Sequence, residues 1–216
     1  GPKTGPSPKL GDIIKVHYTH TETLAADTTY TFGANLSVVS VNKDSADAPT
    51  EMGASGVIGN ASFSILLAQN GFTVYMYGLH FKVTGTVADN LHVGSGATGT
   101  VICEKCYLEL TNNAAASEIR IGPIYASANY SRAVLNNCNL ALGGAAQLIS
   151  LRYDVSIIGG SYTGVAVTGA LFKGAPGTGG PKIFSGFDLT AAGTSSKLVD
   201  TSIVGNDDWV FSNCKL

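Results

Sequence analysis

The sequence predicts an all-β protein, a right-handed single-stranded parallel β-helix of about seven coils. Three observations support this fold. Short apolar segments recur at steps of 22 to 32 residues, each segment alternates apolar with polar residues, and stretches rich in glycine and asparagine separate the segments. The chain has 216 residues, of which 44% are hydrophobic, 13% are charged and 27 are glycine. This composition is typical of one turn-rich domain with a sizeable core.

One ten-residue template occurs six times, beginning with the segment 74–83. It reads apolar-x-apolar-x-x-apolar-x-apolar-x-apolar, so each half has the two-residue period of a strand and the step between the halves is a corner. Aligning the copies produces columns of inward residues that are expected to stack on successive coils. The first column contains Met76, Cys103, Leu135, Ile157, Phe184 and Phe211. The second contains Leu79, Cys106, Cys138, Gly160, Phe187 and Cys214, and the third contains Phe81, Leu108, Leu140, Tyr162, Leu189 and Leu216.

A second set of strands lies between the copies of the template. Its clearest members are the pairs Leu91/Val93, Ile119/Ile121 and Ile149/Leu151, and fainter members are expected near Leu171 and Leu198. The loops between the strands vary in length, as the corners of a coil do. An antiparallel sandwich is the alternative fold, since it also uses short strands and turns, but it does not predict identical columns at these steps.

The repeats also divide the chain. Residues 1–9 are expected to be a tag scar and flexible leader, because Gly1-Pro2 resembles the remnant of a cleaved expression tag. Residues 10–60 are expected to form an N-terminal cap and first coil, with strands at 11–18, 28–32 and 37–41. Residues 61–216 are expected to form the β-helix coils, starting with a strand at 62–67. The template is still running at Leu216, so either the chain is truncated or another chain is expected to cover that end.

Composition and motifs exclude several classes of function. A formal net charge of −2 lacks the basic footprint of a nucleic-acid-binding protein. No apolar run approaches the 18 residues that a membrane-spanning helix needs. Phosphate-binding loops and nucleophile elbows are also missing. We therefore expect no cofactor, no nucleic-acid partner and no membrane association.

The cysteines and histidines favour core and surface roles over a metal site. Cys103, Cys106, Cys138 and Cys214 all fall in inward columns, so we expect free thiols that act as small core residues. A redox or zinc site at the Cys103–Cys106 pair lacks a second ligand pair. His17 and His20 are three residues apart, which places them on opposite faces of a strand and disfavours a shared metal ion.

The acidic residues form no catalytic pair. Glycoside hydrolysis requires two carboxyl groups roughly 5 to 9.5 Å apart. The outward acids of the template are Glu104, Glu109 and Asp188, and Glu109 lies three coils, about 14 Å, from Asp188. We assign no catalytic residue, and the protein is expected not to be an enzyme.

One outward column is unexpectedly apolar. It contains Tyr75, Ile102, Val134, Ser156, Ile183 and Val210. Aligned along one face, these side chains form an apolar stripe that is unusual for a soluble monomer. We interpret its five apolar members as an oligomer interface; the alternative is that a loop such as 143–147 folds over the stripe.

Several segments carry a resemblance to a known group of proteins. They are residues 11–23, 29–33, 38–44, 74–81 and 136–140, which read GDIIKVHYTHTET, TYTFG, VVSVNKD, VYMYGLHF and NNCNL. They resemble tailed-bacteriophage virion structural proteins that contain right-handed β-helices. The resemblance implies a trimer on the virion surface, either a capsid decoration or a tail-associated protein. It carries no catalytic residues to this chain.

The expected function is therefore structural. We expect a non-enzymatic capsid decoration or cementing protein that forms a homotrimer and binds the shell protein. The alternative is a tail-fibre or tailspike domain that binds or cleaves host surface glycans, with Tyr125, Tyr130 and Tyr153 as candidate glycan contacts. A bacterial surface adhesin is a third interpretation, and it would require a secretion signal upstream.

Overall fold

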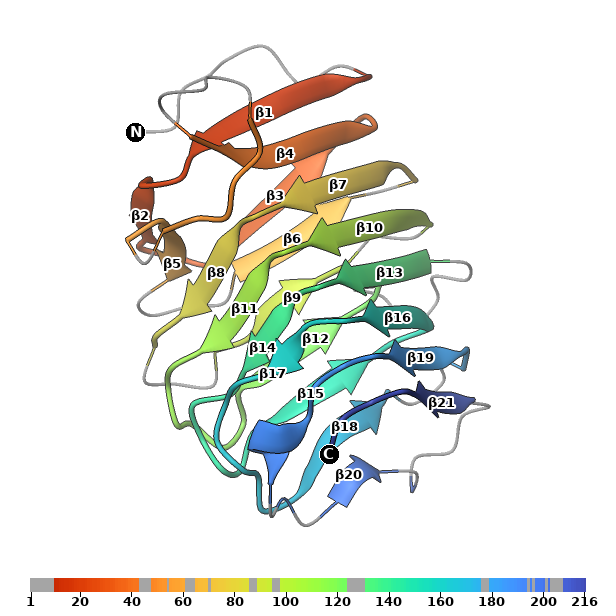
Figure 1. Cartoon of the computed structure of the whole chain (residues 1–216). Helices are drawn as coiled ribbons and strands as arrows, with labels where there is room; N and C mark the ends of the chain where they lie inside the picture. The colour runs from red at the N-terminus through yellow and green to blue at the C-terminus, as the bar shows by residue number, and fades with distance from the viewer. Residues whose placement is uncertain are drawn as a thin grey trace.

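The protein consists almost entirely of short strands that form three parallel sheets, here named A, B and C (Figure 1). The computed structural model describes residues 10–42, 48–53, 55–60, 65–69, 71–85, 89–94, 98–123, 131–175, 179–193, 195, 197–200, 202 and 208–216. The only helix among these residues is a single 3₁₀ turn, η1 (Thr190–Ala192). The described residues therefore have the all-β class and the parallel pairing that the sequence predicts.

Up to Ser185, each sheet takes every third strand of the chain. Sheet A contains β1 (Asp12–His17), β4 (Leu36–Val41), β7 (Thr73–Tyr77), β10 (Gly99–Glu104), β13 (Ser131–Asn136), β16 (Asp154–Ile158), β19 (Lys182–Ser185) and β21 (Trp209–Ser212). Sheet B contains β2 (Thr21–Leu24), β5 (Val57–Asn60), β8 (His80–Val83), β11 (Tyr107–Leu110), β14 (Asn139–Ala141) and β17 (Ser161–Tyr162). Sheet C contains β3 (Thr28–Phe32), β6 (Ile65–Gln69), β9 (Leu91–Val93), β12 (Glu118–Ile121), β15 (Leu148–Leu151), β18 (Ala170–Gly174) and β20 (Lys197–Asp200). After β19 the chain enters sheet C at β20 and returns to sheet A at β21.

Consecutive strands enter the sheets in the order A, B, C, and we call each such set of three a rung. Successive rungs stack in parallel, as Figure 1 shows for sheet A, where the strands follow one another from β1 to β21. Isolated bridges from Ser161 to Asp188 and from Asp188 to Lys215 extend the sheet B ladder beyond β17. This arrangement is consistent with a parallel β-helix.

The pairing register confirms the predicted inward columns except in the last copy of the template, where Leu216 is 84% exposed and is therefore not a core residue. In sheet A, Cys103 pairs with Met76 and Leu135, and the ladder continues through Ile157 and Phe184 to Phe211. The members from Met76 to Phe184 are at most 3% exposed. In sheet B, Leu108 pairs with Phe81 and Leu140. Identical strand positions thus stack on successive rungs and fill one continuous core.

The two-residue step in the template is a left-handed corner between sheets A and B. From β7 onward, the residue that follows each sheet A strand has a φ between 51° and 69°. These residues are Gly78, Lys105, Asn137, Gly159, Gly186 and Asn213. Glycine and asparagine tolerate this conformation, which accounts for five of the six; Lys105 is the exception.

The second strand set forms sheet C, with one correction. Ile119 pairs with Leu91, as the sequence predicts, but Ile149 pairs with Phe172, and Phe172 pairs with Val199. The later members therefore lie one residue beyond Leu171 and Leu198. Leu171 and Phe172 are both fully buried, so the local sequence does not alternate and its phase is ambiguous.

The N-terminal residues contribute to the same three sheets. The strands expected at 11–18, 28–32 and 37–41 correspond to β1, β3 and β4, and the strand expected at 62–67 overlaps β6. Two further strands, β2 and β5, were not expected. β1 pairs with β4, β2 with β5 and β3 with β6, so these six strands build two rungs of the stack.

The cysteines are free thiols, as predicted. Cys103, Cys106 and Cys138 are at most 1% exposed, whereas Cys214 is half-buried. Cys138 Sγ donates to the backbone oxygen of Cys103 at 3.4 Å. Burial raises the pKa of the Cys106 thiol, and a hydrogen bond with Cys106 together with burial raises that of Cys138. Buried, protonated thiols are unreactive and act as core residues.

Two features of the later rungs go beyond the template. Phe184 lies at the centre of an aromatic cluster, with ring centroids 4.7 Å from Phe172 and 4.5 Å from Phe211. Lys182 pairs with Val155 and so occupies an inward position that is valine or alanine on the four preceding sheet A rungs. Its side chain is fully buried, and Nζ donates to the backbone oxygen of Gly180 at 2.9 Å.

Candidate interaction faces

The predicted apolar stripe occupies a single outward column of sheet A. Ile102 pairs with Tyr75 on one side and Val134 on the other. The ladder continues through Ser156 and Ile183 to Val210. All six positions singled out from the sequence are therefore adjacent on consecutive rungs.

The column extends further toward the N-terminus than the sequence indicated. Tyr75 pairs with Ser37, and Ser37 pairs with Ile13 on β1. Ile13 is 60% exposed, and at the other end Val210 is 48% exposed. The stripe, defined as Ile13, Ser37, Tyr75, Ile102, Val134, Ser156, Ile183 and Val210, thus spans sheet A from its first strand to its last, about 34 Å at the spacing of stacked strands.

The stripe is most exposed at its ends. Tyr75, Ile102 and Val134 are half-buried among their neighbours, and Ser156 is buried, whereas Ile183 is 37% exposed. The outward column next to the stripe adds Ile158, which is 44% exposed. Large apolar side chains therefore face solvent at both ends of one sheet, where they are available to a partner.

Loop 143–147 does not cover the stripe. It connects β14 in sheet B to β15 in sheet C, away from sheet A. Gln147 Nε2 donates to Asn112 Oδ1 at 2.7 Å and to the backbone oxygen of Ala114 at 3.1 Å. These bonds hold the loop on the equivalent corner of the preceding rung, so this particular loop does not cover the stripe.

Polar side chains flank the stripe. Arg132 and Asp154 are neighbours in the outward column on one side, and both are exposed. On the other side, Tyr75 Oη donates to Glu104 Oε2 at 2.8 Å, and burial together with this hydrogen bond raises the pKa of Tyr75. An apolar stripe with a polar border has the composition of a protein–protein interface.

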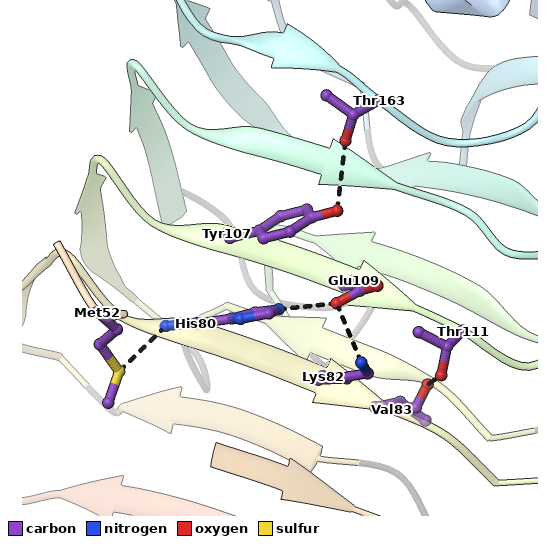
Figure 2. A network of polar contacts seen from close by, with 8 residues as sticks. All are labelled: Met52, His80, Lys82, Val83, Tyr107, Glu109, Thr111 and Thr163. Atoms are coloured by element: carbon purple, nitrogen blue, oxygen red, sulfur yellow. Dashed lines mark hydrogen bonds and ion pairs between the residues drawn. The ribbon is translucent and has the colours of Figure 1, made fainter. Parts of the chain in front are cut away.

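The outward face of sheet B carries a network of polar contacts (Figure 2). His80 Nε2 donates to Glu109 Oε2 at 2.8 Å, and Lys82 Nζ lies 3.8 Å from the same oxygen. The His80 and Tyr107 rings stack with centroids 4.5 Å apart and an interplanar angle of 17°. The His80 and Glu109 side chains are only 14% and 17% exposed. The hydrogen bond from His80, followed by the charge of Lys82, lowers the pKa of Glu109 despite its partial burial.

The network spans four rungs, because Tyr107 reaches over a small residue. Tyr107 Oη lies 3.4 Å from Thr163 Oγ1, two rungs away (Figure 2). The intervening position in the Glu109 column is Ala141, which is 6% exposed. The outward side chains of sheet B therefore bind mainly one another, and we interpret these contacts as stabilising the stack of rungs.

The Glu109 carboxylate is expected to make the free energy of unfolding depend on pH in the acid range. Because folding lowers its pKa, its contribution is fully present above the ordinary glutamate pKa of about 4.3 and is lost as the pH falls through the lower folded pKa. Glu109→Gln is expected to flatten this part of the profile, measured as the free energy of unfolding in urea between about pH 6 and about pH 3.

A matched control is Glu22→Gln, which removes a similar His–Glu pair in an open setting. His20 and Glu22 are 3.4 Å apart, and their side chains are 43% and 48% exposed. Because exposed ion pairs contribute little to stability, this variant is expected to unfold at nearly the same urea concentration as the unmodified protein at about pH 6. If the free energy of unfolding falls equally with pH in Glu109→Gln and in the unmodified protein, the His80–Glu109 pair does not contribute to the acid dependence.

The other candidate residues are scattered. Tyr125 and Tyr130 lie outside the described residues. Tyr153 is half-buried at the corner between β15 and β16, with a φ of 54°. Glu104 and Glu109 lie on the same rung but in different sheets, bound to Tyr75 and His80 respectively. His17 contacts Thr19, and within the described part of the chain no group of three or more potential ligands is placed to hold a metal ion.

A cavity of about 200 Å³ lies in the first rungs of the core. Its lining is almost entirely apolar and includes Ile14, Val16, Tyr30 and Phe32, with Glu22 among its few polar residues. Burial, followed by the charge of Glu22, raises the pKa of Tyr30. The core is therefore less completely filled at this end than in the later rungs.

No protein-family model, curated protein or solved structure matches this chain. Within the described residues, no helix is long and apolar enough to cross a membrane.

Proposed function

We propose that the chain is a right-handed parallel β-helix that assembles into a homotrimer through the stripe on sheet A. We further propose that the trimer is a non-enzymatic structural component of a bacteriophage virion surface. More specifically, we propose a capsid decoration protein that stabilises the shell by binding both copies of itself and the shell protein. The parallel sheets and the strand order A, B, C support the fold, and the resemblance of the coil segments supports the virion role.

The observation that carries the proposal is the register of the stripe. Eight consecutive sheet A strands place their outward residues in one column, and five of the eight residues are aliphatic and one is tyrosine. Burying such a column against other copies contributes roughly 25 cal/mol for each Å² of apolar surface removed from water. A stripe along only one of three sheets suits packing around a threefold axis parallel to the stack.

Low charge favours this assembly. The chain carries a formal net charge of −2, so copies repel one another weakly at close range. The column beside the stripe presents both an arginine, Arg132, and an aspartate, Asp154. Mixed charges at the border fix orientation between copies more than they add affinity.

Val134→Asp tests the interface. Val134 lies near the middle of the stripe, and a carboxylate there would be buried without a partner in the assembled trimer, which costs several kcal/mol for each copy. The expected result is dissociation into folded single chains, measured by sedimentation velocity together with circular dichroism.

The matched control is Val165→Asp, which adds the same charge to a valine that is 42% exposed between β17 and β18. This variant is expected to keep the oligomer mass. Retention of the oligomer by Val134→Asp, with Val165→Asp also unchanged, would overturn the proposed interface.

A second candidate function is a fibre domain that binds host glycans. The feature that favours it is a groove on sheet C, which has charged side chains and a volume suited to a small ligand.

A further inference from the structure

A groove of about 370 Å³ lies on the outward side of sheet C, across β12, β15 and β18. Its floor contains Ser150, which is buried, and its walls include residues 115–117 and 174–175. The lining is about half polar. A concave site of this size is large enough to hold a small organic molecule.

Positive charge predominates around the groove. Arg152 and Lys173 line it, and Arg120 stands beside it because Arg120 pairs with Ser150 in the sheet. Ser150 in turn pairs with Lys173, so the three cationic residues lie on consecutive rungs. The register places Arg152 about 8 Å from both Arg120 and Lys173 at the level of the backbone.

The nearby carboxylates are engaged in local contacts. Glu118 itself lines the groove, and its Oε1 accepts a hydrogen bond from Arg120 Nε at 2.5 Å. Asp200, which pairs with Lys173, accepts hydrogen bonds from the backbone nitrogen and the hydroxyl of Ser202. Arg152 Nη1 also donates to the backbone oxygen of Pro123 at 3.4 Å. Counting Arg120, Arg152 and Lys173 against Glu118 and Asp200, these side chains carry one net positive charge on a chain whose formal net charge is −2.

The groove also places these charges in a partly desolvated setting. Burial, followed by repulsion from Arg120, lowers the pKa of the Arg152 guanidinium. An anion bound beside Arg152 would offset both effects. Guanidinium groups bind carboxylates with two parallel hydrogen bonds, which gives such a site specificity as well as affinity.

We propose that this groove binds a carboxylate-bearing sugar, with Arg152 and Lys173 holding the carboxylate and Ser150 beside the sugar ring. The volume exceeds what a carboxylate alone requires, and the half-polar lining suits a hydroxyl-rich body. This inference deepens the glycan-binding candidate. It does not depend on the stripe of sheet A, which lies on another sheet.

The test is isothermal titration of the full chain with glucuronate, and with acetate and glucose as comparison ligands. Glucuronate is expected to bind, acetate to bind more weakly and glucose not to bind. Added salt is expected to weaken the glucuronate affinity, because the attraction is partly exposed to solvent. No heat with glucuronate, or equal affinity for glucose, would overturn the proposal.

Two variants locate the site. Arg152→Gln and Lys173→Gln are each expected to weaken glucuronate binding about tenfold or more, the usual effect of losing a charge-assisted hydrogen bond. Lys215→Gln is the control, since it removes a charge that is 69% exposed and bound to Asp188 at the sheet B edge. If Arg152→Gln destabilises the fold, Lys173→Gln decides the question, and unchanged binding in Lys173→Gln would contradict the site. Loss of binding with the oligomer intact separates this inference from the proposed interface.

Discussion

Gly160→Ala is expected to destabilise the protein by roughly 3 kcal/mol or more, one of the largest effects available from one added methyl group. Gly160 has a φ of +78°, a conformation that costs an alanine about 1 to 2 kcal/mol. A Cβ at this position would also lie 2.0 Å from the backbone oxygen of Cys138, so the stacked rungs would have to separate. The measurement is the midpoint and free energy of urea unfolding at one fixed protein concentration, since assembly contributes to apparent stability.

Gly186→Ala separates the two causes. Gly186 has a φ of +66°, but nothing lies within 4 Å of an added Cβ. This variant is expected to lose only the conformational cost, about 1 kcal/mol. Equal losses at Gly160 and Gly186 would show that the close approach between the rungs is unimportant.

Phe184→Ala is expected to cost about 3 to 5 kcal/mol, the range for removing a large buried aromatic side chain. Phe184 is fully buried, and its ring contacts those of Phe172, Phe187, Trp209 and Phe211. Its removal would leave a cavity that joins three rungs, and aromatic stacking would be lost with it. Urea unfolding under the same conditions gives the change in free energy.

Phe211→Ala is the matched comparison, because Phe211 follows Phe184 in the same column one rung later. Phe211 is 37% exposed, so its truncation removes less buried surface and leaves an open surface rather than a cavity. We expect a loss of about 1 kcal/mol. A loss as large as that of Phe184→Ala would mean that the last rung is as well packed as the interior.

The inward columns of this fold could be predicted from one sequence. Strands that stack in register need similar residues at equivalent positions, and this requirement appears in the sequence as one alternating pattern that recurs. β2 and β5 escaped prediction for a related reason. β2 has the sequence TETL and is mostly exposed, and β5 has only two aliphatic residues in VIGN. Neither has the alternation that marks a half-buried strand.

The template places Lys182 at its first apolar position, but what allows a lysine to be buried there could not be predicted. A lysine is rarely fully buried, and its place in an apolar column depends on the carbonyl oxygen of Gly180, which a period-two pattern does not reveal. The backbone conformations at the corners could not be predicted from the strand period either. Lys105 adopts a positive φ although its residue type does not favour it, because the corner is repeated on every neighbouring rung.

The candidate faces were predictable to different degrees. The stripe followed from the template, but Ile13 did not, because β1 precedes the first copy of the template and does not share its full pattern. The sheet B network had a readable signal, since His80 shares a template position with Tyr107, and Lys82 shares one with Glu109. The sheet C groove had none, because its walls are corner loops whose shape does not follow from strand periodicity.

The most direct test of the central claim is the solution mass of the unmodified protein by light scattering across a range of concentrations. The chain has a mass of 22.2 kDa, and burial of the stripe between copies predicts a particle of three chains that persists on dilution. A mass of 22.2 kDa at every concentration would contradict the account, because the exposed apolar column of sheet A would then have no partner among copies of this chain.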